Sequence, residues 1–174
     1  EENFKLLIDV SPGGDSSQYL QTLTVGQTLD YLPGKGNFTF HPNDNATNLL
    51  FLATGSGIAP LICIIESLLL QGDTRPITLL FGIRSEQDIF YQDRLDALLT
   101  QSSNFSYAIS LSEPQESWGG SRGHITNHIE NNLHLPWETT SVYLCGSPSM
   151  IMEGQDQLIK LGVPQTQIYF EKYW

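Results

Sequence analysis

The sequence predicts an α/β fold, in which a five-stranded parallel, doubly wound sheet follows a shorter β-rich segment. From residue 48 to the end of the 174-residue chain, apolar strand candidates alternate with helix candidates, as is typical of βαβ units. The strands are continuous apolar runs such as "LLFLA" and "ITLLFGI", which indicates that helices cover both faces of the sheet. The polar, turn-forming stretch "HPNDNATN", residues 41–48, separates the two parts.

The elements of the second part, residues 48–174, follow one another in a regular order. The first helix has Pro60 in its first turn and Gly72 at its end, which matches the usual preference for an early proline and a closing glycine. We expect strands at 49–53, 77–83, 106–112, 141–146 and 167–174, and helices at 59–72, 90–101, 124–132 and 147–162.

Residues 1–41 contain only short strand candidates, at 4–10 ("FKLLIDV"), 28–32 ("TLDYL") and 38–40 ("FTF"). Forty residues of this kind are too few for an independent β domain. We therefore expect them to be the C-terminal part of an antiparallel β-barrel whose first half precedes residue 1. On this interpretation the chain is a fragment of a longer protein.

Composition excludes several classes of function. The chain has 19 acidic and 8 basic residues, a net charge of −11, which argues against a nucleic-acid surface and against docking on anionic lipid. No apolar run is long enough to cross a membrane. Its two cysteines, Cys63 and Cys145, lie far apart in apolar runs, so we expect no metal site, a cytoplasmic setting, and a core position for Cys63.

The stretch "ATGSGIAP" lies between the first strand and the first helix of the second part. Ligands of doubly wound sheets bind at the carboxyl ends of strands. Gly55 and Gly57 lack side chains, so backbone N–H groups there can approach a ligand, and the following helix offers the positive end of its dipole. Thr54 and Ser56 add hydroxyl donors. The stretch indicates either a pyrophosphate site or a simple tight turn, since it lacks the G-x-G-x-x-G pattern.

Five motifs in order along the chain resemble the ferredoxin–NAD(P)H reductase family. They are "TGSGIAP", "FGIRSEQDIFYQDRL", "SLSEP…WGGSRGHIT", "YLCGSPSM" and "YFEKYW". The forms "ATGSGIAP" and "EKYW" look most like bacterial ferredoxin or flavodoxin reductases and dioxygenase reductase components. The resemblance implies that residues 48–174 are an NAD(P)H-binding domain and that residues 1–41 end an FAD-binding β-barrel.

The resemblance also implies an FAD site in the first part. "GGDSSQYL" is similar to the family segment that holds the FAD pyrophosphate, which assigns this role to Gly14, Ser16 and Ser17. In "PGKGNF" the family's glycine–proline pair is reversed, as Pro33–Gly34. The family's Arg-x-Tyr-Ser flavin motif is absent and would lie before residue 1. The alternative is that both segments are ordinary surface turns.

At the far end of the chain the resemblance assigns a nicotinamide site. It implies that Cys145 faces the nicotinamide and shapes the hydride-transfer site, without acting as a nucleophile. Glu171 and Tyr173 correspond to the family's C-terminal carboxylate and stacking aromatic, with Trp174 as one extra residue. Gly146, Ser147 and Pro148 would form the turn after Cys145, and Met150 would open the next helix. The alternatives are a packed structural thiol and an aromatic strand end.

Ser112 and Glu113 bear on the choice between NADH and NADPH. In NADP-using members a Ser-Arg pair binds the 2′-phosphate at this point, and here Glu113 replaces the arginine. A second basic family position corresponds to His124, which is mostly neutral at pH 7. Both changes favour NADH. NADPH is the alternative nucleotide, because Arg84 and Arg122 lie near the expected site and could contact its phosphates.

The resemblance predicts an FAD-dependent oxidoreductase. It would take a hydride from NADH, or NADPH, and pass electrons to a ferredoxin, a flavodoxin or a fused iron–sulfur domain. One alternative is a nucleotide-binding regulatory module without flavin turnover, and another is a flavin-independent dehydrogenase. Three other positions look structural: we expect Trp118 to anchor a loop, and His41 and His128 to be surface or cap residues.

Overall fold

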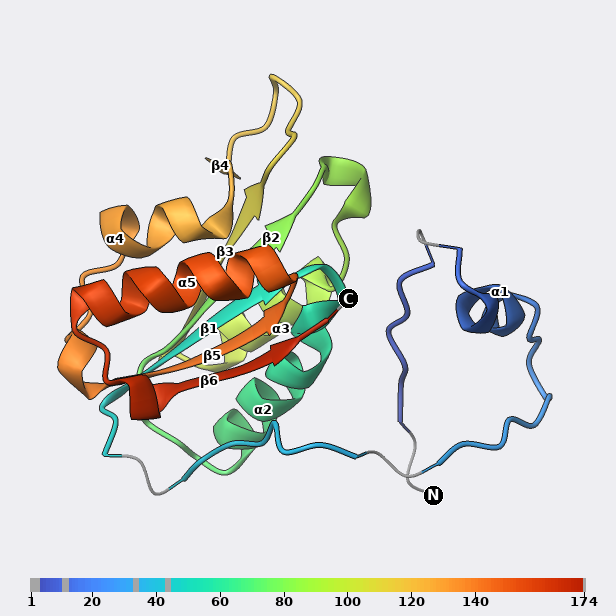
Figure 1. Ribbon diagram of the computed structural model, residues 1–174, viewed down its shortest axis with the longest axis horizontal. Coiled ribbons are helices and arrows are strands. Elements are labelled where there is room, and N and C mark those ends of the chain that lie inside the picture. Colours follow the sequence, from blue (N-terminus) through green and yellow to red (C-terminus); the bar gives the residue numbers. More distant parts are fainter. Residues whose placement is uncertain (1–3, 11–12, 33–34, 43–44, 174) are drawn as a thin grey trace.

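A computed structural model describes residues 4–10, 13–32, 35–42 and 45–173, and a single parallel sheet forms the centre of the molecule (Figure 1). Every pairing between the described strands is parallel, and the strand order is β4-β3-β2-β1-β5-β6. The strands are β1 (Asn48–Thr54), β2 (Ile77–Ile83), β3 (Phe105–Leu111), β4 (Ser121–Arg122), β5 (Thr140–Gly146) and β6 (Ile168–Lys172).

The five expected strands are confirmed, and β4 is an addition. It has two residues, which pair with Ser110 and Leu111 at the end of β3. So short a strand carries no periodic signal, which is why the sequence did not predict it.

Helices cover both faces of the sheet, as a doubly wound fold requires. One hydrophobic cluster joins the sheet to α2 (Ile58–Leu70) and α3 (Gln92–Gln101), and a second joins it to α4 (Ile129–Asn132) and α5 (Pro148–Leu161). The chain runs from β1 to β2 and β3 on one side, then returns to β5 and β6 on the other. The direction of winding therefore reverses between β1 and β5.

The central strands are buried on both faces, as their continuous apolar sequences predict. Residues 49–53 of β1 and all seven residues of β5 are buried. In α2 only one stripe faces the core, formed by Ile58, Leu61, Ile62, Ile65 and Leu68.

Cys63 lies outside that stripe and is exposed, so the expectation of a core position was wrong. The local composition is apolar throughout, and composition alone does not show which face of a helix is buried.

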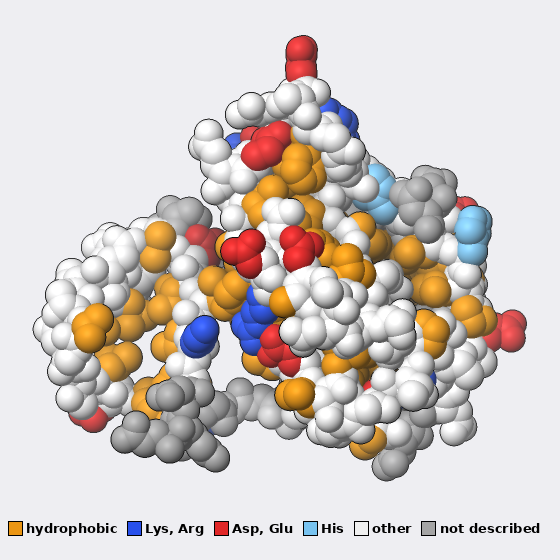
Figure 2. All heavy atoms as spheres, turned by 180° about the vertical axis from the view of Figure 1, so that it is seen from behind, with side chains coloured by type: hydrophobic (Ala, Val, Ile, Leu, Met, Phe, Trp, Pro, Cys, Tyr) orange, Lys and Arg blue, Asp and Glu red, His pale blue; other side chains and the backbone are white. Residues whose placement is uncertain are grey.

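The segment before the sheet differs from its expected form. Its described residues contain one helix, α1 (Asp15–Gln21), and no strand, so the strands expected at 4–10, 28–32 and 38–40 were wrong. A strand needs a partner for its backbone hydrogen bonds, and none of the described residues pairs with them. Phe4, Leu6 and Tyr31 are exposed, and Figure 2 shows hydrophobic side chains uncovered on this segment. The assignment of residues 1–41 to a barrel stays a prediction, and Pro33–Gly34 lies outside the described residues.

An aromatic column crosses the sheet and fixes the chain that enters it. Phe51, Tyr143 and Tyr169 occupy paired positions on β1, β5 and β6, and their rings stack at 5.2 and 4.8 Å. His41 continues the stack on Tyr169 at 4.1 Å, and its backbone N–H donates to the Tyr143 hydroxyl at 3.1 Å. Phe40 also packs on Tyr143. Residues 40–41 are thereby attached to the far strands of the sheet.

Replacing Tyr143 should show how much this column stabilises the domain. Tyr143→Ala removes a fully buried ring and should lower the free energy of unfolding by about 3–5 kcal/mol. Tyr143→Phe keeps the stack, loses the acceptor for His41, and should cost about 1 kcal/mol. Urea unfolding monitored by circular dichroism measures both. Equal effects of the two changes would contradict a role for ring stacking.

Candidate nucleotide-binding site

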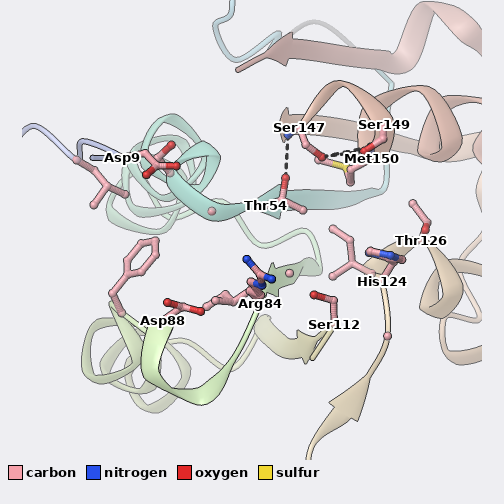
Figure 3. Close-up of a pocket in the computed structure, with 18 of the residues that line it drawn as sticks. Asp9, Thr54, Arg84, Asp88, Ser112, His124, Thr126, Ser147, Ser149 and Met150 are labelled. Atoms are coloured by element: carbon pink, nitrogen blue, oxygen red, sulfur yellow. Dashed lines mark hydrogen bonds between the residues drawn. The ribbon is translucent and has the colours of Figure 1, made fainter. Parts of the chain in front are cut away.

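A cavity of about 720 Å³ opens at the carboxyl ends of the strands (Figure 3). Its floor is formed by the ends of β1, β2 and β3, with Thr54, Gly82 and Ser112 among the lining residues. One wall comes from the start of α5 and the turn before α4, and residues 7–10 of the N-terminal segment close the other side. The cavity thus lies where the winding of the sheet reverses, the usual ligand position in such folds.

The turn after β1 brings bare backbone to the cavity. Gly55 has φ +52°, a left-handed conformation that favours glycine, and no other atom occupies the place of its missing β-carbon. A β-carbon on Gly57 would lie 2.3 Å from the carbonyl oxygen of Cys145, so only glycine fits there. Ser56 lines the cavity beside Gly55. The two glycines predicted to open this turn are therefore needed for different purposes. Gly55 leaves space for a ligand, and Gly57 leaves space for β5.

A hydrogen bond joins the turns that follow β1 and β5. The Ser147 backbone N–H donates to the Thr54 hydroxyl at 2.9 Å (Figure 3). Gly146, at φ +143°, makes this approach possible, because a β-carbon there would lie 2.1 Å from the Thr54 Oγ1. Ser147 then caps α5 by accepting the Met150 N–H, and Pro148 occupies the first turn.

Two helices begin at this edge of the sheet, α2 after the glycine turn and α5 after Ser147. The first turn of a helix has unpaired N–H groups and a partial positive charge. No acidic residue lies in the first turn of either helix. Both helix starts are therefore suited to an anionic ligand, although the whole chain carries a net charge of −11.

Cys145, Glu171 and Tyr173 form a second cluster, at the ends of β5 and β6. Cys145 pairs with Glu171 across the two strands, and the Tyr173 N–H donates to the Gly146 carbonyl at 2.8 Å. Burial, with a smaller effect from the negative charge of Glu171, raises the pKa of the Cys145 thiol to about 12, although a hydrogen bond from Tyr173 acts against this. Burial also raises the pKa of Tyr173 to about 12. Both groups are neutral near pH 7.

Arg84 and Glu113 form an ion pair beyond the ends of β2 and β3, on the other side of β1 from that cluster, which does not itself line the cavity. The Arg84 Nε lies 2.9 Å from the Glu113 Oε2, and the side chains are 73% and 62% exposed. The hydrogen bond with Glu113 raises the pKa of Arg84. Ser112 lines the cavity next to this pair. The guanidinium expected near the site therefore already has an anionic partner.

Arg122 points into its own loop. Its Nη2 donates to the carbonyl oxygens of Gln115, Glu116 and Trp118, at 2.8–3.0 Å. The Trp118 indole donates to the Ser121 carbonyl at 2.9 Å, which confirms its role as a loop anchor. His128 contacts Ser110 and the Arg122 carbonyl through Nε2, so it holds the same loop. Arg122 therefore stabilises its loop and is not among the lining residues.

The structure brings most of the predicted nucleotide-binding residues together. Thr54, Gly55, Ser56, Arg84, Ser112, Ser147 and Met150 line the cavity, with His124 among them. Gly57, Pro60, Glu113, Gly146 and Pro148 lie in the same turns or next to them but are not lining residues.

The expected FAD contacts lie elsewhere. Gly14 is the N-cap of α1, Ser16 is exposed, and the Ser17 hydroxyl donates to the Gly14 carbonyl at 2.8 Å. The turn is open to solvent and leaves the Ser16 hydroxyl accessible, which fits a pyrophosphate contact. Trp174 lies outside the described residues.

Sequence reasoning missed several lining residues. Thr126, Ser149 and Glu153 form part of the wall between α5 and the 3₁₀ turn η3 (Ile125–His128). Glu153 lies one helical turn after Met150, which places both residues on the same face of the helix. This spacing could have identified Glu153 as a lining residue from the sequence. Residues 7–10 had none, because their place beside the cavity depends on long-range packing.

Metal-binding and membrane-spanning features are both absent from the part of the chain that the structure describes. In residues 4–10, 13–32, 35–42 and 45–173, no group of three or more His, Cys, Asp or Glu side chains could hold a metal ion. Among the helices of the described ranges, none is long and apolar enough to span a membrane.

Together, the doubly wound parallel sheet, the glycine turn after β1 and the cavity at the switch point define a dinucleotide-binding α/β domain. Comparison with known families agrees, because residues 51–156 match the oxidoreductase NAD-binding domain family. The chain belongs to this family, and its relatives include a ferredoxin–NADP reductase and a dioxygenase electron transfer component.

Three curated relatives illustrate the range of the similarity. Ferredoxin–NADP reductase B of Sorangium cellulosum is 34% identical over 98% of this chain and 72% of its own length. The toluate 1,2-dioxygenase electron transfer component of Pseudomonas putida is 30% identical over 96% of this chain and 49% of its own. NADH-cytochrome b5 reductase 1 of Laccaria bicolor is 35% identical over 94% and 54%. The chain thus spans about half the length of two of them.

The fold is also shared with solved structures. An Amycolatopsis cytochrome P450 reductase superposes with a TM-score of 0.83, covering 92% of this chain and 49% of that one, at 22% identity. The parallel, doubly wound architecture predicted from the sequence is therefore confirmed.

The two cysteines should differ sharply in reactivity. The thiolate is the reactive form, and with a pKa of about 12 only about one Cys145 in ten thousand is ionised at pH 8. Iodoacetamide at pH 8 should therefore modify exposed Cys63 in the folded protein and leave Cys145 intact, while both react in urea. Peptide mass spectrometry measures this. Equal labelling of both sites in the folded protein would contradict the burial of Cys145.

Proposed function

We propose that this chain carries the NADH-binding domain of an FAD-dependent oxidoreductase. The observation that supports it is a row of complementary groups along one sheet edge. An ion pair and Ser112 lie at one end, two helix N-termini at the centre, and the neutral Cys145–Tyr173 pair beside Glu171 at the other end. A dinucleotide has a ribose and base at one end, an anionic pyrophosphate at its centre, and a nicotinamide at the other end.

The glycine turn would bind the pyrophosphate. Gly55 exposes backbone to the cavity, Thr54 and Ser56 add hydroxyls, and Gly57 lets the turn pack closely against β5. Ser147, Pro148 and Met150 at the start of α5 would complete the binding surface, and Pro60 and Gly146 keep the two turns in shape. These contacts use dipoles rather than cationic side chains, which suits a protein that is acidic overall.

Cys145, Glu171 and Tyr173 would shape the nicotinamide end. The thiol and the phenol are neutral, and both are partly or fully buried. A neutral, water-poor site accepts a nicotinamide ring and keeps solvent away from hydride transfer. Tyr173 would cover the adjoining flavin surface until nicotinamide replaces it, and Trp174 would extend that cover.

FAD supplies the hydride-accepting and electron-passing chemistry when bound. We propose that Gly14, Ser16 and Ser17 contact its pyrophosphate, because this turn presents backbone and a free hydroxyl to solvent. The remaining contacts would come from the barrel half expected before residue 1. The proposed domains are therefore 1–41, the end of the FAD-binding barrel, and 48–174, the NAD(P)H-binding domain.

Glu113 supports a preference for NADH over NADPH. Its carboxylate is paired with Arg84 and adds negative charge where a 2′-phosphate would lie. The second candidate cation, Arg122, is bound to three carbonyl oxygens of its loop. Ser112 and Glu113 can instead accept hydrogen bonds from ribose hydroxyls.

For the electron acceptor we propose a ferredoxin, a flavodoxin or a fused iron–sulfur domain. The support is the similarity to a ferredoxin–NADP reductase and to a dioxygenase electron transfer component. The relative named as a cytochrome b5 reductase makes a haem protein the competing acceptor. Both cysteines are free thiols, which supports a reducing, cytoplasmic setting.

The proposal is tested by adding NADH to the full-length protein loaded with FAD, in the absence of oxygen. Bleaching of the flavin absorbance by NADH within one turnover supports hydride transfer, and reduction of an added ferredoxin supports the acceptor. Binding of NADH without bleaching would favour the regulatory alternative. The 174-residue chain, titrated by calorimetry, reports on the nucleotide site alone.

Glu113→Gln should shift the protein toward NADPH. The change frees Arg84 and removes a repelling carboxylate, so the dissociation constant for NADPH should fall by about fivefold, with little change for NADH. Calorimetric titration with both dinucleotides measures the ratio. Glu116→Gln, an exposed acid in the same loop, is the matched control and should leave the ratio unchanged. A fivefold gain in the control variant would show that net charge, and not the Arg84 pair, is responsible.

A further inference from the structure

The wall of the cavity between α5 and η3 contains a carboxylate that the proposed pyrophosphate and nicotinamide contacts do not use. Glu153 and Met150 line this wall from α5, one helical turn apart. Ile125 and Thr126 line it from η3, and His124 lines it from the residue before η3. Figure 3 shows Met150, His124 and Thr126 on the same side of the cavity, beyond Ser147.

The Glu153 carboxylate is held by a buried group. The Thr126 hydroxyl, on a residue that is only 2% exposed, donates to the Glu153 Oε2 at 3.2 Å. Glu153 itself is exposed at the rim. A carboxylate at the rim of a cavity, bound by the protein through one oxygen, can accept a further hydrogen bond from a ligand.

The neighbours of this carboxylate indicate which part of a dinucleotide it meets. A phosphate would be repelled by Glu153, so the anionic centre of the ligand lies elsewhere, at the helix starts. The adjoining lining residues Ile125 and Met150 are apolar and suit the faces of a flat ring. A flat ring that also carries a hydrogen-bond donor on its edge describes adenine, through its 6-amino group.

We propose that Glu153 accepts a hydrogen bond from the 6-amino group of the adenine base and so selects adenine over other purines. Thr126 is the positioning residue that orients the carboxylate. This inference rests on the proposed function, because it takes the ligand to be a nicotinamide dinucleotide. In hypoxanthine a carbonyl oxygen replaces the 6-amino group. This oxygen would face the Glu153 carboxylate, and because both groups are acceptors no hydrogen bond would form between them.

The test compares NAD⁺ with nicotinamide hypoxanthine dinucleotide, by calorimetry on the full-length protein loaded with FAD. The unmodified protein should bind NAD⁺ about tenfold more tightly, the usual effect of a hydrogen bond to a charged group set against an unpaired acceptor. Glu153→Gln should reduce the ratio to within about twofold, because its amide can accept from an amine or donate to a carbonyl. Thr126→Val should reduce it partly, and Thr126→Ser should restore it.

Asp156→Asn provides the matched control. Asp156 is an exposed acid on the same helix that does not line the cavity, so its removal should leave the ratio at the original value. An unmodified protein that binds both dinucleotides equally, or a Glu153→Gln variant with an unchanged ratio, would overturn this inference alone. If neither dinucleotide binds any of the variants while their melting temperatures are normal, the proposed function fails, and this inference fails with it.

Discussion

The contact between the ends of β1 and β5 is the constraint on which the rest of the site depends. Gly57 and Gly146 leave no room for a β-carbon, and the Thr54 hydroxyl accepts the Ser147 N–H across the gap. This contact brings the starts of α2 and α5 to one cavity. It also fixes where β5 ends, and therefore where Cys145 lies relative to Glu171 and Tyr173. A larger residue at either glycine would separate the parts of the site that have to act on a single ligand.

The site attracts an anion locally in a chain that is acidic overall. Three arginines of the chain already have partners: Arg84 pairs with Glu113, Arg94 pairs with Glu66, and Arg122 binds loop carbonyls. Backbone dipoles act over a short range and need no mobile cation. Binding that depends on such dipoles therefore fixes the position of the ligand, because its phosphates have to lie at the helix starts. It also leaves the carboxylates Glu113 and Glu153 available for neutral, hydrogen-bonding parts of the ligand.

Much of this architecture could be predicted from the sequence. Continuous apolar strands alternating with amphipathic helices predicted the parallel sheet, because local periodicity and burial agree there. The glycine turn predicted a ligand site, because it leaves backbone uncovered at a strand end, where parallel sheets bind their ligands. The short β4 and the exposure of Cys63 could not be predicted, since two residues carry no period and an apolar helix does not show which face is buried.

Other features depended on contacts between residues far apart in the chain. Arg84 lines the cavity but is paired with Glu113, and Arg122 is bound to carbonyl oxygens of its own loop. Neither partner could be predicted from the local sequence. The spacing of Glu153 from Met150 indicated that both lie on one face of the helix. The hydrogen bond from Thr126, which suggests a role for the carboxylate, is visible only in the structure. The strands expected before residue 41 lacked partners, which no local pattern reveals.

The aromatic column has a consequence for motion between the two parts of the protein. Because His41 stacks on Tyr169 and Phe40 packs on Tyr143, the chain that enters the nucleotide domain is anchored on β5 and β6, the strands that carry Cys145 and Glu171 near their ends. Any rotation of the N-terminal part relative to this domain must therefore be absorbed before Phe40. The pivot lies upstream of that clamp, so the edge of the sheet where hydride transfer is proposed keeps its position relative to residues 40–41 during such a rotation.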